Sequence, residues 1–285
     1  MGDWAAFFTI AWPSTYAYYF FSIGLSAALY FISGLSWFRE EFRGLRTNAF
    51  LLSFALLVIS GLLLISDLSQ PMRFLNMINP FYWNFTSPLV WGAILLMLFG
   101  AVSAGYYLLM KQGNEILAKK LAVVGSLIAL GLPIYTGFDL SVHQHRPVWN
   151  SPLMSVLAVS LSIISGAAVA SFLAKGEAKL LASLRQIMLV AGGATAVMLL
   201  ALMVTTAYGG SAAELTYMFM TSGSMGVVFV GLGVVVGTII PVAVLAIPFG
   251  RQANGIMLAS VLLLVGGMAL RYAILIGPQI VHTYF

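Results

Sequence analysis

The sequence contains no cysteine, and 7% of its 285 residues carry a charge. The missing thiols exclude disulfides, thiolate metal sites and cysteine-bound iron–sulfur clusters in this chain. A soluble domain carries about 25% charged residues, so a chain that is 61% hydrophobic meets mostly lipid as its solvent. The net charge of +5 does not indicate nucleic-acid binding, because the basic residues are spread over short connections and form no patch.

Histidine is scarce as well, and its three copies, His143, His145 and His282, fall outside the long apolar segments. A haem held inside a membrane by two histidines needs both ligands on membrane-spanning helices. The sequence therefore predicts that the membrane part of this chain holds no b-type haem.

Eight apolar segments are each long enough to cross a bilayer, because about 20 residues at ~1.5 Å each cover a hydrocarbon core of about 30 Å. We predict an all-α integral membrane fold with eight transmembrane helices in one domain, residues 1–285, built as two four-helix bundles over residues 1–140 and 141–285. Residues 1–14 are expected at the membrane interface, and the lack of a basic N-terminal region argues against a cleavable signal peptide. The segments lie near residues 15–37, 47–66, 88–110, 118–140, 152–174, 186–208, 223–247 and 254–276.

Basic residues are distributed unevenly between the two ends of these segments. The first, third, fifth and seventh connections hold ten of the 13 lysines and arginines, whereas the opposite side holds Arg73 and Arg146. Arg271 lies inside the eighth segment. Because the side richer in Lys and Arg is normally cytoplasmic, we expect both termini and the connections 67–87 and 141–151 on the outer face.

Ionisable side chains at membrane depth are costly, so each one is a candidate functional residue. Asp67 ends the second segment, Asp139 ends the fourth, Glu214 follows the sixth and Arg271 lies within the eighth. All four fall toward the outer face in the predicted topology. We therefore expect the chemistry of the chain to take place near that face.

Tyr135 and Asp139 are four positions apart, which places them on one face of a continuous helix. A tyrosine hydroxyl can donate to a carbonyl and a carboxylate can relay a proton, which suits a quinone head group. Pro133 and Gly137 flank the tyrosine; proline frees backbone carbonyls and glycine lets a flat ring approach the helix. The competing interpretation is an interfacial aromatic belt with a solvated carboxylate at the helix end.

The outer connections carry further polar pairs. Asp67 and Arg73 flank Pro71 and are expected to pair across that turn. His143 and His145 stand at alternate positions, which suits either a metal ion, with Asp139 as a third ligand, or a contact with a partner protein and proton buffering. The second alternative is favoured because no other ligand lies nearby in the sequence, so we predict no metal site.

Two similar tetrapeptides open the third and fifth segments, "TSPL" at residues 86–89 and "NSPL" at residues 150–153. Serine can cap a helix and proline suits its first turn, so both tetrapeptides predict helix starts.

Several of these stretches together resemble one known family, the NrfD-like proteins, which include the membrane subunit of polysulfide reductase. The most specific stretches are "LLLISDLSQPMRFLNMINPF" with "TSPLVWG", and "YTGFDLSVHQHRPVWNSPL"; "AYYFFSIGLSAA" and "LRYAILIGPQ" are also similar. The resemblance touches the whole chain, and the eight-segment count is similar to the shorter branch of the family.

The resemblance implies a multi-pass subunit of a prokaryotic cytoplasmic (inner) membrane without haem. It implies menaquinone or ubiquinone as the cofactor, bound in the first half. It also implies electron exchange with an iron–sulfur subunit on the outer face and, through it, with a catalytic subunit, typically a molybdopterin enzyme.

Residue roles follow from the same resemblance. Tyr135 matches the family's quinone-facing tyrosine. The first segment carries Thr15, Tyr16 and Tyr19 where family members can carry His or Asn, a difference for which His143 and His145 can compensate. The implied quinone-binding set is Tyr135, Thr136, Gly137, Asp139, Thr15, Tyr16 and Tyr19. The implied proton-transfer set is Asp67, Asp139 and His143. The residues expected in structural or partner contacts are Arg73, His145, Arg146, Trp149 and Asn150.

We therefore predict a quinone-reactive membrane subunit of an oxidoreductase. Two alternatives remain: a passive membrane anchor, and a proton- or solute-translocating protein. The transporter is disfavoured because the ionisable residues gather at one face rather than at the midplane. A proton route from the other side would need polar groups through the bundle, for which the candidates are Ser22, Ser26, Ser33, Ser53 and Ser60.

Overall fold

The computed structural model describes residues 12–67 and 71–280. Within these ranges every regular element is helical, and eight helices are long and apolar enough to cross a membrane. The predicted all-α integral membrane fold is thereby confirmed. Most of the expected interfacial leader, and His282, lie outside the described residues.

The eight spans follow the predicted segments closely. They comprise α1 (Thr15–Leu35), α2 (Arg46–Ser66, preceded by η2, Glu40–Leu45), α3 (Pro88–Lys111), α4 (Glu115–Ser141), α5 (Leu153–Leu173), α6 (Ala178–Ala207), the continuous set α8 (Gly223–Gly226), η5 (Val227–Ile239) and α9 (Ile240–Ala246), and α10 (Ala253–Ile280). Shorter helices lie in the connections: η3 (Pro71–Ile78), η4 (Pro80–Tyr82), α7 (Ser211–Thr221) and η6 (Pro248–Arg251).

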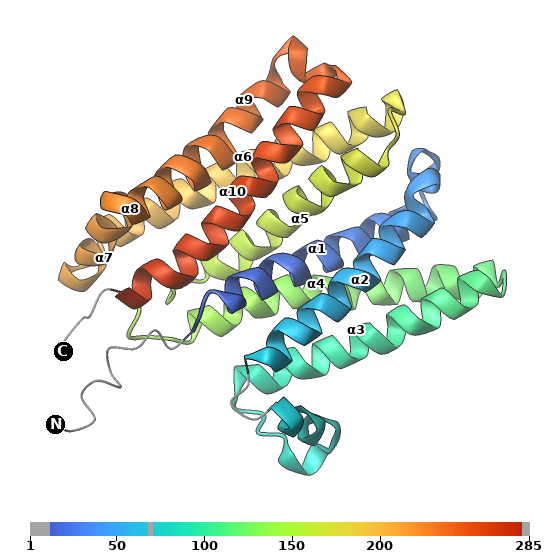
Figure 1. Ribbon diagram of the computed structural model, residues 1–285, viewed down its shortest axis with the longest axis horizontal. Helices are drawn as coiled ribbons and strands as arrows, with labels where there is room; N and C mark the ends of the chain where they lie inside the picture. Colours follow the sequence, from blue (N-terminus) through green and yellow to red (C-terminus); the bar gives the residue numbers. More distant parts are fainter. Residues whose placement is uncertain (1–11, 68–70, 281–285) are drawn as a thin grey trace.

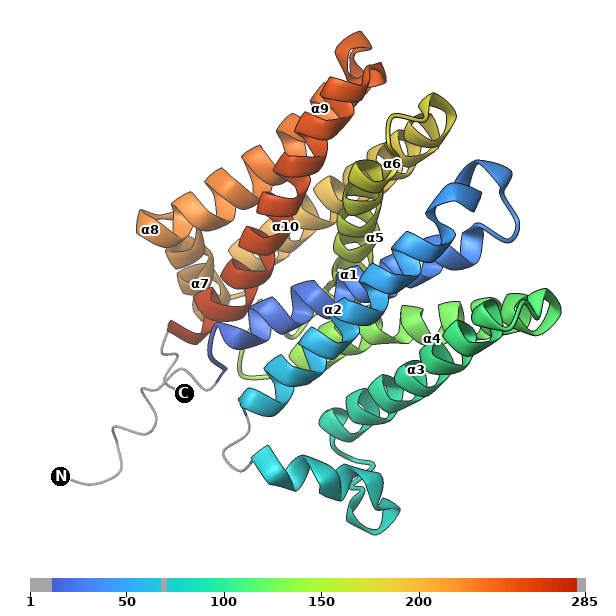
Figure 2. The ribbon, with the colours of Figure 1, turned by 45° about the vertical axis from the view of Figure 1, so that its right-hand side comes forward.

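Helix α1 lies in the middle of the molecule, between α2–α4 on one side and α5–α10 on the other (Figures 1 and 2). It contacts α2, α4, α5 and α10, which fits its small residues. A Cβ at Gly24 would meet the Ser162 hydroxyl at 2.4 Å, and a Cβ at Gly166 would meet the Ala28 side chain at 2.3 Å. Small side chains allow such close helix approach in membranes. The division into two four-helix bundles stays a prediction.

Polar contacts join α1 to α2 at a regular interval, because three α2 residues and Asp67, which directly follows α2, are spaced seven positions apart and each meet a partner on α1. Ser26 and Ser53 each donate to the other's carbonyl, at 2.8 and 2.6 Å. These bonds hold one helix to the other in an apolar surrounding. The remaining contacts of the set are Thr15 to Asp67 at 3.1 Å, Ser22 to Ser60 at 2.7 Å and Ser33 to the Arg46 carbonyl at 2.8 Å.

Three features differ from the sequence expectation. Helix α6 begins at Ala178 rather than near residue 186, since the helix extends beyond the apolar stretch through a charged turn. Glu214 lies in α7, a separate helix too short to span a membrane, and the seventh span is a π-helix over Val227–Ile239.

The predicted helix starts are present, with different capping. Ser87 is the N-cap residue before Pro88, but its side chain makes no cap bond, whereas the Ser151 hydroxyl accepts from the Leu153 amide at 3.3 Å.

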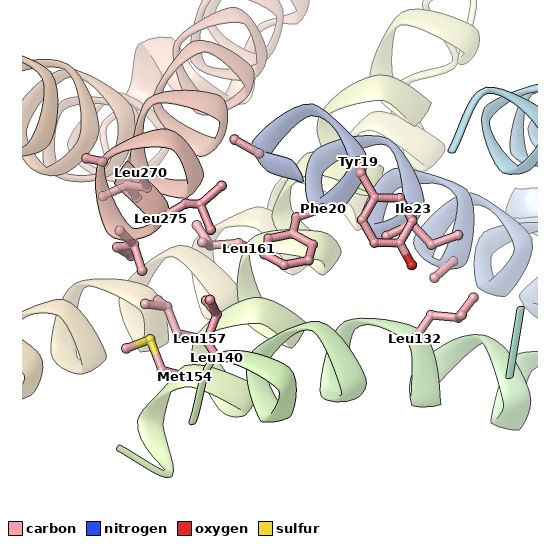
Figure 3. Packing of buried hydrophobic residues seen from close by; sticks show 14 of the residues in the cluster. Tyr19, Phe20, Ile23, Leu132, Leu140, Met154, Leu157, Leu161, Leu270 and Leu275 are labelled. Atoms are coloured by element: carbon pink, nitrogen blue, oxygen red, sulfur yellow. The ribbon is translucent and has the colours of Figure 1, made fainter. Parts of the chain in front are cut away.

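The core at the centre of the molecule is apolar. Figure 3 shows Phe20 and Leu161 between Tyr19 on one side and Leu270 and Leu275 on the other. This packing joins α1, α4, α5 and α10 into one body, so these helices are fixed relative to one another.

Candidate functional site

A cavity of about 780 Å³ lies between α2 and α3, with η3 across one end. The two helices barely touch each other, so the space between them is left to apolar side chains such as Leu64, Leu89 and Met97. On α3 the lining runs from Leu89 to Gly100, which corresponds to about 16 Å along the helix. The shape and lining suit a long apolar molecule.

Among the residues that the structure describes, two polar ones line this cavity, Tyr16 of α1 and Arg73 of η3. Tyr16 stacks on Trp12 with ring centroids 5.1 Å apart, which fixes the orientation of its ring. The Tyr16 hydroxyl also lies within electrostatic reach of two carboxylates, Asp67 and Asp139. Donors and proton acceptors therefore gather at the η3 end of an otherwise apolar space.

Asp67 does not pair with Arg73 as the sequence suggested. Its carboxylate accepts a hydrogen bond from the Thr15 hydroxyl at 3.1 Å. Between two described residues, the one ion pair that forms is Arg39 with Glu41, at the opposite end of the bundle. The reason is that η3 turns Arg73 toward the cavity between α2 and α3, while Asp67 stays against α1.

Tyr135 and Asp139 share one face of α4, as their spacing predicted. The Tyr135 hydroxyl donates to the Asp139 carboxylate at 3.4 Å, and both side chains are buried. The tyrosine ring lies directly on Gly92 of α3, where an added Cβ would come within 2.0 Å of the ring. Tyr19, also buried, lies within electrostatic reach of Asp139 from α1.

Thr136 and Gly137 are not brought to this cavity. The Thr136 hydroxyl donates to the Pro133 carbonyl at 2.9 Å, and both Thr136 and Gly137 line a separate small cavity on the other side of α4. A Cβ at Gly137 would meet the backbone of Ser155 at 2.3 Å. Gly137 therefore serves the close contact of α4 with α5, and Gly92 is the glycine that accommodates the aromatic ring.

The connection after α4 folds over Asp139. One ring nitrogen of His143 lies 2.9 Å from the Asp139 carbonyl, and its ring packs edge-on against Trp12 and Trp149, at 5.2 and 5.5 Å. His145 lies against His143 at 5.7 Å. Burial, with smaller effects of Arg146 and His143, lowers the pKa of His145 from its ordinary value, so this ring is neutral at neutral pH.

Arg146 and Trp149 attach the same connection to the last helix. Arg146 donates to the Pro278 carbonyl at 2.6 Å, and Trp149 donates to the Ile274 carbonyl at 2.6 Å. Trp149 is 2% exposed, so its role is structural. Asn150 is exposed, and its backbone N–H donates to the Arg146 carbonyl at 2.9 Å. Burial lowers the pKa of Arg146.

Two residues of the site were missed by sequence reasoning. Trp12 precedes the first span, yet it stacks on Tyr16, contacts His143 and exchanges two hydrogen bonds with Gln279 of α10. Gly92 follows Trp91 in the "TSPLVWG" stretch, and a glycine one turn into a helix is the signal that could have indicated a close ring contact.

Known proteins with similar sequences identify the family of the chain. Residues 5–282 match the family described as "Polysulphide reductase, NrfD". A polysulfide reductase chain of Wolinella succinogenes is 28% identical, with 95% of each of the two sequences covered. A tetrathionate reductase subunit of Salmonella typhimurium is 32% identical over 50% of this chain and 43% of its own length, and protein NrfD of Escherichia coli is 29% identical over 58% and 59%. With the family matched along nearly its whole length and eight spans in place, the chain belongs to the polysulphide reductase NrfD family of multi-pass membrane proteins.

Proposed function

We propose that this chain is the quinone-reactive membrane subunit of a respiratory oxidoreductase complex. It exchanges electrons between menaquinone or ubiquinone in the membrane and an iron–sulfur subunit docked at the outer face. That subunit in turn serves a catalytic subunit, for which a molybdopterin enzyme is the expected type. The named relatives, which include reductase chains and subunits, support a place in such a complex.

The observation that carries this proposal is the cavity between α2 and α3. Its apolar length suits an isoprenoid tail, and its polar end offers the Tyr16 hydroxyl and the Arg73 guanidinium as donors to a quinone carbonyl. Such a ligand needs few polar contacts, placed at one end, and the lining has that distribution. Bound quinone would supply two-electron, two-proton redox chemistry.

Proton transfer is assigned to the carboxylates behind Tyr16. Asp67 is held by Thr15, and Asp139 is held by Tyr135. Each carboxylate can therefore take a proton from the polar end of the cavity while keeping a hydrogen-bond partner. His143 lies against the backbone of Asp139 and borders the outer connection, which makes it the next carrier toward the aqueous side.

The positions of these residues fit the topology expected from the lysine and arginine distribution. Asp67, Asp139 and His143 lie at the helix ends assigned to the outer face. On this assignment both termini also face outward across the cytoplasmic membrane of a prokaryote, and the iron–sulfur subunit docks beside η3 and the connection 142–152. Exposed side chains such as Phe81 and Tyr82 in η4 border that face.

The test is a pair of substitutions in the cavity, Tyr16→Phe and Arg73→Gln, in the purified complex. Losing one hydrogen bond of about 1–1.5 kcal/mol should raise the KM for quinol about 5–10-fold in each variant. Tyr107→Phe is the matched control, because Tyr107 is half-exposed near the cytoplasmic end of α3. Quinone binding to the chain in lipid nanodiscs gives a second readout that does not depend on turnover.

A passive anchor predicts the opposite result: neither substitution alters turnover or quinone binding, and the complex still assembles. Solute uptake by the chain in liposomes would instead favour the transporter alternative.

A further inference from the structure

Arg271 is a charged residue in the membrane interior that the proposed quinone chemistry does not use. It lies on α10, nine positions before the helix ends at Ile280, which corresponds to about 13 Å along the helix axis. Its side chain is 7% exposed. A guanidinium stays charged under nearly all conditions in proteins, so the protein must stabilise a full positive charge at this depth.

The helices around Arg271 are shaped to hold it. A Cβ at Gly24 of α1 would come within 3.1 Å of one terminal guanidinium nitrogen, and a Cβ at Gly267 of α10 within 3.4 Å of the other. The ring of Phe21 lies 5.3 Å from the guanidinium carbon. The backbone of two helices therefore leaves room for this side chain between α1, α5 and α10.

The hydrogen-bond partners of the guanidinium are uncharged groups. Its two terminal nitrogens donate to the Gly267 carbonyl at 3.1 Å and to the Ser162 hydroxyl at 3.3 Å. In the part of the chain that the structure describes, no carboxylate lies within ion-pair distance of Arg271. A guanidinium has five N–H donors, so three are not used by these bonds. An uncompensated charge in an apolar interior is strongly unfavourable.

A cavity of about 40 Å³ lies beside Arg271. Among the described residues its polar lining consists of Arg271 and Thr136, and the rest is apolar, including Phe20, Leu157 and Leu161, which Figure 3 shows packed at this junction. One water-sized particle occupies about 30 Å³. The space therefore suits a single small ion or one water molecule.

We propose that this cavity binds one monovalent halide-type anion, chloride in the cell, which neutralises Arg271 inside the bundle. The guanidinium supplies the charge and its unused N–H groups supply the donors. The Thr136 hydroxyl, which now donates to the Pro133 carbonyl, can rotate to supply one more. The site lies on the opposite side of α4 from Tyr135, so it does not depend on quinone binding.

The first experiment measures bound halide directly. The protein is purified in gluconate throughout, equilibrated with bromide, freed of unbound salt and denatured, and the released bromide is quantified by ion chromatography. Wild-type protein should release one bromide per chain, and Arg271→Gln should release none. Arg185→Gln is the matched control, because Arg185 donates to the Leu245 carbonyl and does not line this cavity; it should still release one.

The second experiment measures thermal unfolding as gluconate is replaced by chloride. Binding to the folded state alone raises Tm with a saturating dependence on chloride, by about 3–6 °C when the chloride concentration is about ten times the Kd. Sulfate should give no such rise. If Arg271→Gln does not fold, Arg271→Lys keeps a charge beside the cavity and should retain the chloride dependence.

A wild-type protein that releases no bromide and shows no specific chloride effect would mean that water alone fills the cavity, which overturns the proposal. Bromide retained by Arg271→Gln would also overturn it, because the ion would then be bound elsewhere. Either failure leaves the proposed quinone function untouched, since the two sites share no polar contact.

Discussion

Gly92→Ala tests the arrangement of the candidate site with one methyl group. In the native structure an added Cβ would lie 2.0–2.5 Å from three atoms of the Tyr135 side chain, two in the ring and the hydroxyl oxygen. Ordinary contact requires about 3.4 Å or more, so the ring must move by more than about 1 Å. Because Tyr135 is buried between α3 and α4, that movement draws its hydroxyl away from Asp139.

The magnitude follows from two opposing effects. Overpacking of a buried contact costs about 1–3 kcal/mol, whereas replacing glycine by alanine within a helix gains about 1 kcal/mol. Gly100→Ala isolates the second effect, since Gly100 lies on the same helix, with no atom within 4 Å of its added Cβ. The difference between the two variants in unfolding free energy should therefore be about 1–3 kcal/mol.

Two quantities are measured. The first is the unfolding free energy of the purified chain in detergent, and the second is the quinol-linked turnover of the complex. Gly92→Ala should be less stable than Gly100→Ala, and its turnover should fall about tenfold or more if Tyr135 and Asp139 act in the reaction. Equal stability of the two variants would refute the packing argument. Lower stability with unchanged turnover would support the packing argument but would show that Tyr135 does not act in the reaction.

Three further changes have defined outcomes. Ser26→Ala should destabilise the fold by about 0.6 kcal/mol, and the double variant with Ser53→Ala should cost less than the sum, measured by a double-mutant cycle. Trp149→Phe leaves the Ile274 carbonyl without its donor and should cost about 1–3 kcal/mol in unfolding experiments. Because the pKa of His145 is lowered in the folded state, the unfolded chain binds its proton more readily; stability should fall as the pH drops below about 6.5, and His145→Gln should flatten that decline in Tm.

Much of the fold could be predicted from the sequence because membrane helices depend on local hydropathy. The apolar segments matched the eight spans, and the spacing of Tyr135 and Asp139 was enough to place both on one helix face. Such features are set within one or two helical turns, where periodicity is reliable. The main boundary error, at α6, arose where the helix extends beyond the apolar stretch.

Contacts between distant segments could not be predicted in this way. Asp67 was paired with Arg73, six positions away, but its partner Thr15 lies 52 positions away on another helix. Gly137 looked suited to a ring contact, yet it packs against α5, and Gly92 takes that role from α3. A glycine in the sequence indicates that a close contact is possible, but the partner in that contact depends on the tertiary packing.

Helix α1 fixes these distant groups relative to one another. Its α2-facing side repeats polar residues that meet α2 every seventh position, from Ser33 near the C-terminal end of the helix to Thr15 beside Asp67. Its other side carries Gly24, which admits Arg271 from α10. Tyr16 therefore has a fixed position relative to both carboxylates, because α1 is held along its whole length from two sides. A change in either set of contacts should move the polar end of the cavity even when it lies far from Tyr16.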